Sequence, residues 1–259
     1  DNILICKLNA NGTVAWTRSF GGKGNERGHS LIQDNLGRII IAGYTENDSV
    51  NVGSNGDSDF QLLAVSTAGG VLRSKNIGSN DSEYASKIIR SQDNQYYVGG
   101  DIKTNGGADE GILVCKLDTN FNILSSELLE SNFSDKLKDM KLAGNNSMVI
   151  AISSTSLFSS NAVIFSMSSN GSVSTGQNLG DMGFDGQSGI SIMGSETRGF
   201  SMFSSGASLG NTSSEDLYIT KIPKSFTVPC KSDFESVQQK GGLNLSVNSF
   251  SQISVLNSN

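Results

Sequence analysis

The stretch Leu-Ile-Gln-Asp-Asn-Leu-Gly-Arg-Ile-Ile-Ile at residues 31–41 decides the fold, because two short apolar runs flank a cluster of turn-forming residues. Asp, Asn and Gly tolerate positive φ and favour chain reversal, so the stretch predicts a β-hairpin. The pattern returns along the chain. The apolar position that ends the best-defined strand of each unit recurs with spacings of 57, 52, 50 and 55 residues, at Leu8, Val65, Leu117, Met167 and Ile222. A repeat of this length made of strands predicts the blades of a β-propeller.

Further positions keep the same register. Eighteen residues after each of the first four markers stands an acid, and twenty-three residues after it an apolar residue that we place on the innermost strand. A turn-type residue follows twenty-nine residues after each marker. The acids are Glu26, Glu83, Asp135 and Asp185, the apolar residues Leu31, Ile88, Met140 and Ile190, and the turn residues Gly37, Asn94, Asn146 and Glu196.

The sequence therefore predicts an all-β chain, a β-propeller of four-stranded antiparallel blades with four to five blades in this chain. The many Gly residues, 30 of 259, agree with numerous turns. We assign residues 1–230 to the blades and residues 231–259 to a C-terminal tail. Two interpretations of the tail stay open: residues 243–247 and 250–255 complete a fifth blade with the two N-terminal strands, or the tail is a linker into a further domain.

Charge and cysteine content restrict the setting. A net charge of −6 and a pI of about 4.8, with no basic stripe in the sequence, argue against a nucleic-acid partner or an anionic membrane surface. No apolar run is long enough to predict a transmembrane segment. The chain opens inside a strand pattern without Met or signal peptide, as at a cut or a boundary. Cys6 and Cys115 occupy one register position and are expected in the core, too far apart to pair, whereas the role of Cys230 is open.

A family resemblance starts at the first unit. Ile3 to Leu8, the Asn11-Gly12 turn, Trp16, the run from Phe20 to Glu26 and the run from Gly37 to Thr45 resemble the bacterial SBBP-type β-propeller repeat of secreted and surface proteins of Bacteroidetes. The resemblance covers about residues 1 to 230 and fades through the third and fourth units. It implies an exported protein, often a cargo of the type IX secretion system, with adhesion or gliding motility as settings. The family name suggests seven blades, which would place further blades upstream. It implies no reaction and no catalytic residue.

Several side chains invite a functional interpretation. The ring of acids at Glu26, Glu83, Asp135 and Asp185 could hold a cation, but one acid per unit favours a structural hydrogen bond into the next blade. The loop from Asn47 to Asp59 offers oxygen ligands yet lacks the alternation of a calcium loop, which favours a solvated turn. His29 is the one histidine of the sequence, which excludes a His-based zinc cluster. We expect it to make a polar contact at the surface. Trp16 and Tyr97 fit core positions. We therefore predict no catalytic residue, no metal and no cofactor.

Three functions are compatible with these features. We favour a non-enzymatic extracellular or cell-surface module that binds a protein or glycan through variable loops at residues 46–58, 103–110, 154–161 and 206–216, because insertions on one face of a repeat array often mark the binding face. The second is a carbohydrate-active hydrolase or lyase with its site in the propeller channel, against which the apolar inner-strand positions argue. The third is a rigid spacer in an adhesin or secretion assembly.

Overall fold

The fold is described from a computed structural model. The structure describes residues 1–22, 24–46, 57–104, 110–155, 160–174, 177–178, 190–195, 199–208, 211–222, 238–240, 245–249 and 254–257. Within these residues the chain is β throughout, apart from one 3-10 turn at Gly144–Asn146. The all-β prediction is therefore confirmed.

The strands form five antiparallel sheets that follow one another along the chain, here numbered sheet 1 to sheet 5. Sheet 1 holds β1 (Ile3–Leu8) and β2 (Val14–Gly21). Sheet 2 holds β3 (Asn25–Gln33), β4 (Ile39–Glu46), β5 (Ser58–Val65) and β6 (Val71–Gly78). Sheet 3 holds β7 (Ser82–Arg90), β8 (Tyr96–Lys103), β9 (Glu110–Leu117) and β10 (Ile123–Glu130). Sheet 4 holds β11 (Ser134–Leu142), β12 (Met148–Thr155), β13 (Ser160–Met167) and β14 (Gln177–Asn178), and sheet 5 holds β15 (Ser191–Ser195), β16 (Gly199–Ser208) and β17 (Asn211–Ile222).

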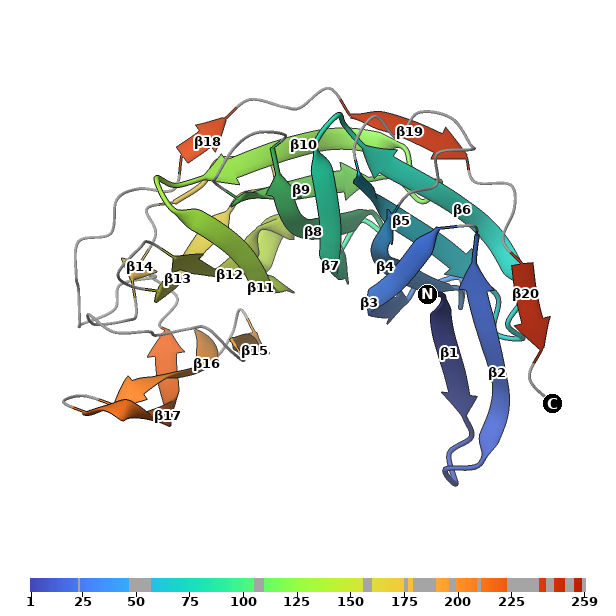
Figure 1. Cartoon of the computed structure of the whole chain (residues 1–259), viewed down its shortest axis with the longest axis horizontal. Helices are drawn as coiled ribbons and strands as arrows, with labels where there is room; N and C mark the ends of the chain where they lie inside the picture. Colours follow the sequence, from blue (N-terminus) through green and yellow to red (C-terminus); the bar gives the residue numbers. More distant parts are fainter. Residues whose placement is uncertain are drawn as a thin grey trace.

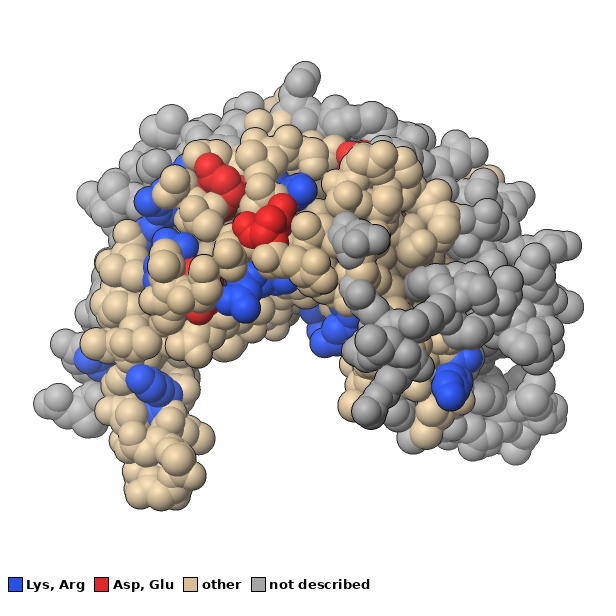
Figure 2. Space-filling view, turned by 180° about the vertical axis from the view of Figure 1, so that it is seen from behind, with Lys and Arg blue, Asp and Glu red and all other residues tan. Residues whose placement is uncertain are grey.

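The five sheets lie side by side along an arc (Figure 1). The first strand of sheets 2, 3 and 4, which we call the inner strand, lies on the concave side, and β6 and β10 lie on the convex side. Figure 2 shows the same arc from behind, hollowed on its concave side. The four-stranded antiparallel unit predicted from the repeat is present in sheets 2, 3 and 4, and no sheet formed by the described strands closes on itself.

The predicted turn residues have the backbone conformation that their identity suggests. Gly37, Asn94 and Asn146 stand at φ angles of 76°, 61° and 58°, in the left-handed region that Gly and Asn enter most readily. In the first of these turns the Asp34 carboxylate accepts hydrogen bonds from the backbone N–H groups of Leu36 and Arg38, both at 2.9 Å. The hairpin predicted at residues 31–41 is the β3–β4 pair, with Leu31 opposite Ile41.

The core lies between neighbouring sheets. Apolar residues of sheets 2 and 3 form the largest cluster, in which Phe60, Leu62 and Tyr96 are completely buried. Similar clusters join sheets 3 and 4, sheets 4 and 5, and sheets 1 and 2. Tyr97 is buried as predicted, and so is Cys115, but Cys6 is exposed. The prediction for Cys6 is wrong because Ile3 and Ile5 point from β1 into the core, which places Cys6 on the opposite face of sheet 1.

The C-terminal tail adds one strand to each of three sheets. β18 (Gln238–Lys240) pairs with β10, β19 (Ser246–Ser249) with β6 and β20 (Ser254–Asn257) with β2, all antiparallel. The tail thus runs back along the convex side from sheet 3 to sheet 1 (Figure 1). Its strands satisfy backbone groups that the outer edge of a sheet leaves unpaired.

This pairing differs from the fifth-blade interpretation. Among the described tail strands only β20 joins the N-terminal strands, and it pairs on the outer side of β2 rather than beside β1. Residues 223–237, on which the linker interpretation rests, lie outside the described part, as does Cys230. The division at residue 230 stays a prediction.

Candidate functional site

Two of the repeated acids, Glu83 and Asp135, accept hydrogen bonds from the connections between sheets. The backbone N–H of Ser79 donates to Glu83 at 3.1 Å, and its hydroxyl donates to the same carboxylate. The N–H and hydroxyl of Ser131 donate to Asp135 at 2.8 and 2.9 Å. Each serine lies in the segment that leads from an outer strand to the next inner strand. These contacts favour the structural interpretation of the ring of acids.

Burial separates these acids from solvent. Glu26, Glu83 and Asp135 are exposed by 1%, 0% and 0%, and Asp185 lies outside the described residues. Burial raises the pKa of Glu83 to about 7, and it also raises the pKa of Asp135. Among the described members, the ring therefore presents no accessible carboxylate to a ligand.

The loop that could hold a metal is described only at its end. Asp57 and Asp59 belong to the described residues, whereas residues 47–56 do not. Asp59 is 2% exposed, and burial raises its pKa to about 6. Within the described ranges, no group of three or more His, Cys, Asp or Glu side chains is placed to hold a metal ion.

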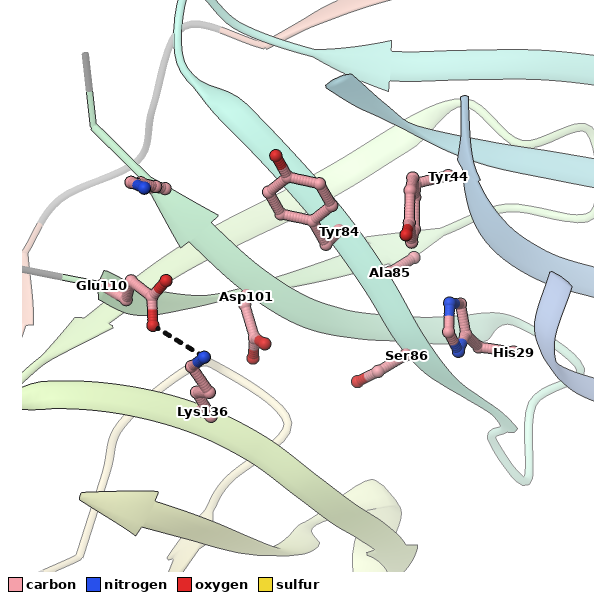
Figure 3. Close-up of a pocket in the computed structure, with 9 residues that line it drawn as sticks. His29, Tyr44, Tyr84, Ala85, Ser86, Asp101, Glu110 and Lys136 are labelled. Atoms are coloured by element: carbon pink, nitrogen blue, oxygen red, sulfur yellow. Dashed lines mark ion pairs between the residues drawn. The ribbon is translucent and has the colours of Figure 1, made fainter. Parts of the chain in front are cut away.

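A cleft of about 340 Å³ lies where sheets 2, 3 and 4 meet (Figure 3). Its walls come from both strands of the hairpin that opens sheet 2, from three strands of sheet 3 and from the inner strand of sheet 4. The lining residues are His29, Tyr44, Tyr84, Ala85, Ser86, Asp101, Lys103, Glu110 and Lys136. The cleft is therefore formed jointly by three consecutive sheets.

A repeated β-bulge shapes the concave side. The register shifts between Gly28 and Ser30 in β3, between Ala85 and Lys87 in β7, and between Leu137 and Asp139 in β11. The residues passed over are His29, Ser86 and Lys138, which share one repeat position. A bulge breaks the pairing locally and re-aims a side chain, and bulges are frequent next to functional sites. Two of the three bulge residues, His29 and Ser86, line the cleft.

Three rings form one wall of the cleft. The rings of His29 and Tyr44 are stacked, with centroids 5.4 Å apart, and Tyr44 meets Tyr84 edge-on at 4.9 Å. Burial and the positive charge of nearby Arg27 lower the pKa of His29, so this ring is neutral at neutral pH. The row therefore offers aromatic surface together with hydroxyl and imidazole hydrogen-bonding groups.

The opposite wall is charged. Lys136 and Glu110 form an ion pair at 3.2 Å across sheets 4 and 3 (Figure 3). Asp101 accepts a hydrogen bond from the backbone N–H of Leu137 at 2.7 Å, and burial raises its pKa to about 6. The cleft thus combines carboxylate acceptors with ammonium donors, which suits a ligand that carries hydroxyl or charged groups.

The structure corrects one argument made from the sequence. The apolar residues predicted for the innermost strands, Ile88, Met140 and Ile190, are exposed by only 3%, 1% and 5%, because they pack into the core between sheets. Leu31 is the exception at 60%. Apolar residues at these positions therefore do not make the concave side apolar. His29 is exposed on the bulge of β3, where its ring contact with Tyr44 could not be read from the sequence.

No family model matches the chain, and no curated protein has a similar sequence. Within the described residues, no helix is long and apolar enough to cross a bilayer. The site must therefore be interpreted from its own geometry.

Proposed function

We propose that the protein is a non-enzymatic β-propeller module of a secreted or cell-surface bacterial protein, and that it binds a glycan or protein partner on the face that carries its variable loops. The succession of antiparallel sheets along an arc, with inner strands on the concave side, supports the propeller arrangement (Figure 1).

The observation that carries this proposal is that the cleft is lined by residues at the strand ends that flank two of the variable loops. The loops at 46–58 and 103–110 join β4 to β5 and β8 to β9, the second and third strands of their sheets. Tyr44, Lys103 and Glu110 lie within three residues of these connections and line the cleft. Loops carried by a rigid scaffold are where binding residues concentrate.

A glycan suits the cleft chemically. Sugar rings have apolar C–H faces and a rim of hydroxyl groups, so they need flat apolar surface beside hydrogen-bonding groups. The rings of His29, Tyr44 and Tyr84 supply the surface, and Asp101, Glu110 and Lys136 supply acceptors and donors. A cleft with a few convergent polar groups is the usual form of a small-ligand site.

Binding to a glycan array tests this proposal. The wild type should bind a defined set of glycans, and Tyr84→Ala should lose that binding because it removes one ring of the wall. Leu72→Ala is the matched control, since Leu72 is an exposed apolar residue on outer strand β6 and its loss should leave binding unchanged. Equal binding by wild type and Tyr84→Ala would exclude the cleft as the binding site, and a wild type without glycan or protein ligands would favour the spacer.

A second function has one specific observation in its favour. The raised pKa of Asp101, about 6, leaves this carboxyl partly protonated near neutral pH, in a cleft that is also lined by the carboxylate of Glu110 and the imidazole of His29. Such groups could serve a carbohydrate hydrolase or lyase. Release of reducing or unsaturated sugar ends by the wild type, abolished in Asp101→Asn, would replace the binding module with this enzyme. Asn at this position keeps an oxygen that can accept from Leu137.

A further inference from the structure

The inner strands distribute charge unequally between their exposed and buried positions. Every acid on β3, β7 and β11 is buried, with at most 3% exposed. Every basic residue on these strands is exposed or half-buried. The acids are Glu26, Glu83, Asp135 and Asp139, and the basic residues are Arg27, Lys87, Arg90, Lys136, Lys138 and Lys141.

The concave rim of the arc is therefore basic, although the whole chain has a net charge of −6 (Figure 2). The sequence shows no single basic stripe because these residues come from three strands, near residues 27, 87–90 and 136–141, which the sheets bring together. Three of them are paired: Arg27 with Asp1, Lys87 with Asp139 and Lys136 with Glu110. Within the described part of the chain, no ion pair is formed by Arg90, Lys138 or Lys141, nor by Lys103 on β8.

Two of the basic residues, Lys103 and Lys136, line the cleft itself. The pair between Lys136 and Glu110 is open to solvent, with the two side chains exposed by 51% and 24%. An exposed pair of this kind contributes little to stability, so Lys136 can exchange Glu110 for an anionic group of a ligand at little cost. A concave surface of one charge also raises the local concentration of an oppositely charged ligand.

We propose that the ligand of the cleft is a carboxylated glycan, a polymer of uronic acids whose carboxylates are held by Lys103 and Lys136. This inference rests on the proposed function and specifies its ligand. Tyr44 and Tyr84 contact the apolar face of a sugar ring, Asp101 and Glu110 accept hydrogen bonds from its hydroxyl groups, and the basic rim attracts neighbouring sugars of the same chain. Each sugar carries one charge, so the charges of the polymer are spaced apart. This spacing suits a surface on which basic residues alternate with aromatic and acidic ones.

Nucleic acid fits the same surface less well. Its phosphates are densely spaced and need a continuous series of basic contacts. The cleft instead holds two carboxylates, those of Asp101 and Glu110, beside its lysines. These acids would repel a closely spaced series of phosphates, whereas they can bind sugar hydroxyl groups.

The experiment compares charged and neutral forms of the same polymer by titration calorimetry. The probes are oligomers of galacturonate and of mannuronate, each with its methyl-esterified counterpart. We expect at least one uronate to bind, its methyl ester to bind about tenfold more weakly or worse, and its affinity to fall with added salt.

The variants locate the charge. Lys103→Gln combined with Lys136→Gln should weaken uronate binding about tenfold or more, a loss of about 1.4 kcal/mol. Lys75→Gln, on outer strand β6, makes the same kind of charge change away from the cleft and should leave the affinity within about twofold. Circular dichroism spectra should show that all variants stay folded.

Three results would overturn the inference: no uronate binds, an ester binds as tightly as its acid, or the double variant binds like the control. Tighter binding of single-stranded DNA than of every uronate would overturn it as well and assign the basic rim to nucleic acid. A methyl ester that binds the wild type as tightly as its acid does, and that fails to bind Tyr84→Ala, would overturn only the role of the carboxylate, while the proposed binding module would stand.

Discussion

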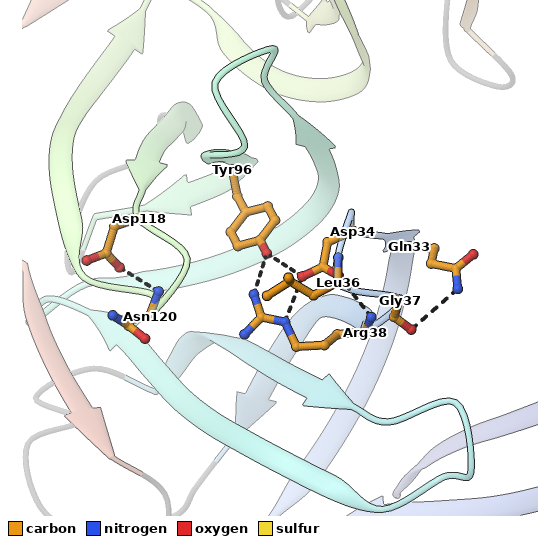
Figure 4. Close-up of polar contacts among 8 residues, drawn as sticks. All are labelled: Gln33, Asp34, Leu36, Gly37, Arg38, Tyr96, Asp118 and Asn120. Carbon is orange, nitrogen blue, oxygen red and sulfur yellow. Dashed lines mark hydrogen bonds and ion pairs between the residues drawn. The ribbon is translucent and has the colours of Figure 1, made fainter.

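At the residue scale, one tyrosine ties two sheets together. The hydroxyl of Tyr96, on β8, donates to Asp34 at 3.0 Å and accepts from Arg38 at 3.1 Å, and both partners belong to the turn of sheet 2 (Figure 4). Arg38 and Asp34 also form an ion pair at 2.7 Å. Burial alone would raise the pKa of Asp34, but the hydrogen bonds from Arg38 and Tyr96 outweigh it and hold that pKa below its ordinary value.

Replacing Tyr96 by Phe should therefore destabilise the protein. The change keeps the ring in the core but leaves the charged groups of Asp34 and Arg38 with one partner fewer, which costs about 1.5–3 kcal/mol for hydrogen bonds to charged groups. Urea unfolding measures the loss. Tyr97→Phe is the control, because the Tyr97 hydroxyl makes only a 3.3 Å contact to the backbone oxygen of Asn146 and should lose less. Equal losses in the two variants would contradict the importance of the network.

A buried acid makes stability depend on pH in a definite direction. Burial raises the pKa of Glu83 to about 7 despite two hydrogen bonds from Ser79, and the charge of Asp59 raises it further. A carboxyl whose pKa is higher in the folded than in the unfolded protein binds more protons when folded. Its contribution is therefore fully present below its unfolded pKa and is lost as the pH rises through about 7.

The variant Glu83→Gln should remove much of this dependence. We expect it to be more stable than wild type at pH about 8 and no more stable at pH about 4, since Gln is neutral at both and keeps an acceptor for Ser79. Thermal unfolding across this range measures the crossover. A wild type that becomes more stable as the pH rises from about 5 to 8, by an amount that Glu83→Gln removes, would contradict the sign.

At the scale of the element, the bulges demand particular residues opposite them. Gly100 on β8 pairs with Ala85, directly before the bulge at Ser86, and a Cβ at Gly100 would overlap the carbonyl oxygen of Tyr84. Gly43 stands in the same relation to the bulge of β3, where a Cβ would overlap the carbonyl oxygen of Arg27. The obstacle in both cases is backbone, which cannot move aside as a flexible side chain can.

Gly100→Ala should consequently be strongly destabilising, by about 2 kcal/mol or more, because the bulge must open to admit the methyl group. Gly70→Ala is the matched control, since a Cβ there would meet only the Ser66 hydroxyl, at 3.4 Å. Chemical denaturation measures both. If Gly100→Ala is as stable as Gly70→Ala, the close approach of β7 and β8 at this point is not tight.

The elements also show what can be predicted from the sequence. The hairpin at residues 31–41 and the positive-φ turns at Asn94 and Asn146 were predictable because alternating apolar residues and turn residues act locally. The bulges were not predictable, because a bulge that recurs in every inner strand leaves the spacing of the repeat markers regular. The repeated position shared by His29, Ser86 and Lys138 was visible as a register, but nothing in it distinguished a bulge from a paired residue.

At the scale of the whole molecule, the parts that depend on distant segments escaped prediction. The cleft gathers His29, Tyr84 and Lys136 from three sheets, and the basic rim gathers charge from three inner strands. Both require the angle between sheets, which the sequence pattern does not encode. The pairing of β18, β19 and β20 with outer edges was not predicted either, and the linker interpretation of the tail stays a prediction.

Removing the tail gives a prediction at this scale. A chain that ends at Ile222 lacks β18, β19 and β20, so outer strands β6 and β10 lose their partners. Amide hydrogen exchange in these strands should become about tenfold faster or more, because their edge amides lose the hydrogen-bond partners that protect them from water. Exchange in β12, which is paired with β11 and β13 and with none of the described tail strands, is the internal control and should not change. Unchanged exchange in β6 and β10 would contradict the pairing.

The course of the tail also bears on how the molecule unfolds. In a repeat array each unit contacts only its neighbours, so units at one end can open while the others stay folded. A single segment that hydrogen-bonds to sheets 3, 2 and 1 in turn adds a connection between units that are not neighbours. Sheet 1 cannot separate without releasing β20, and losing that anchor weakens the hold of β19 and β18 on the next two sheets. The tail therefore couples the stabilities of sheets 1, 2 and 3, and we expect these three sheets to unfold as one cooperative unit.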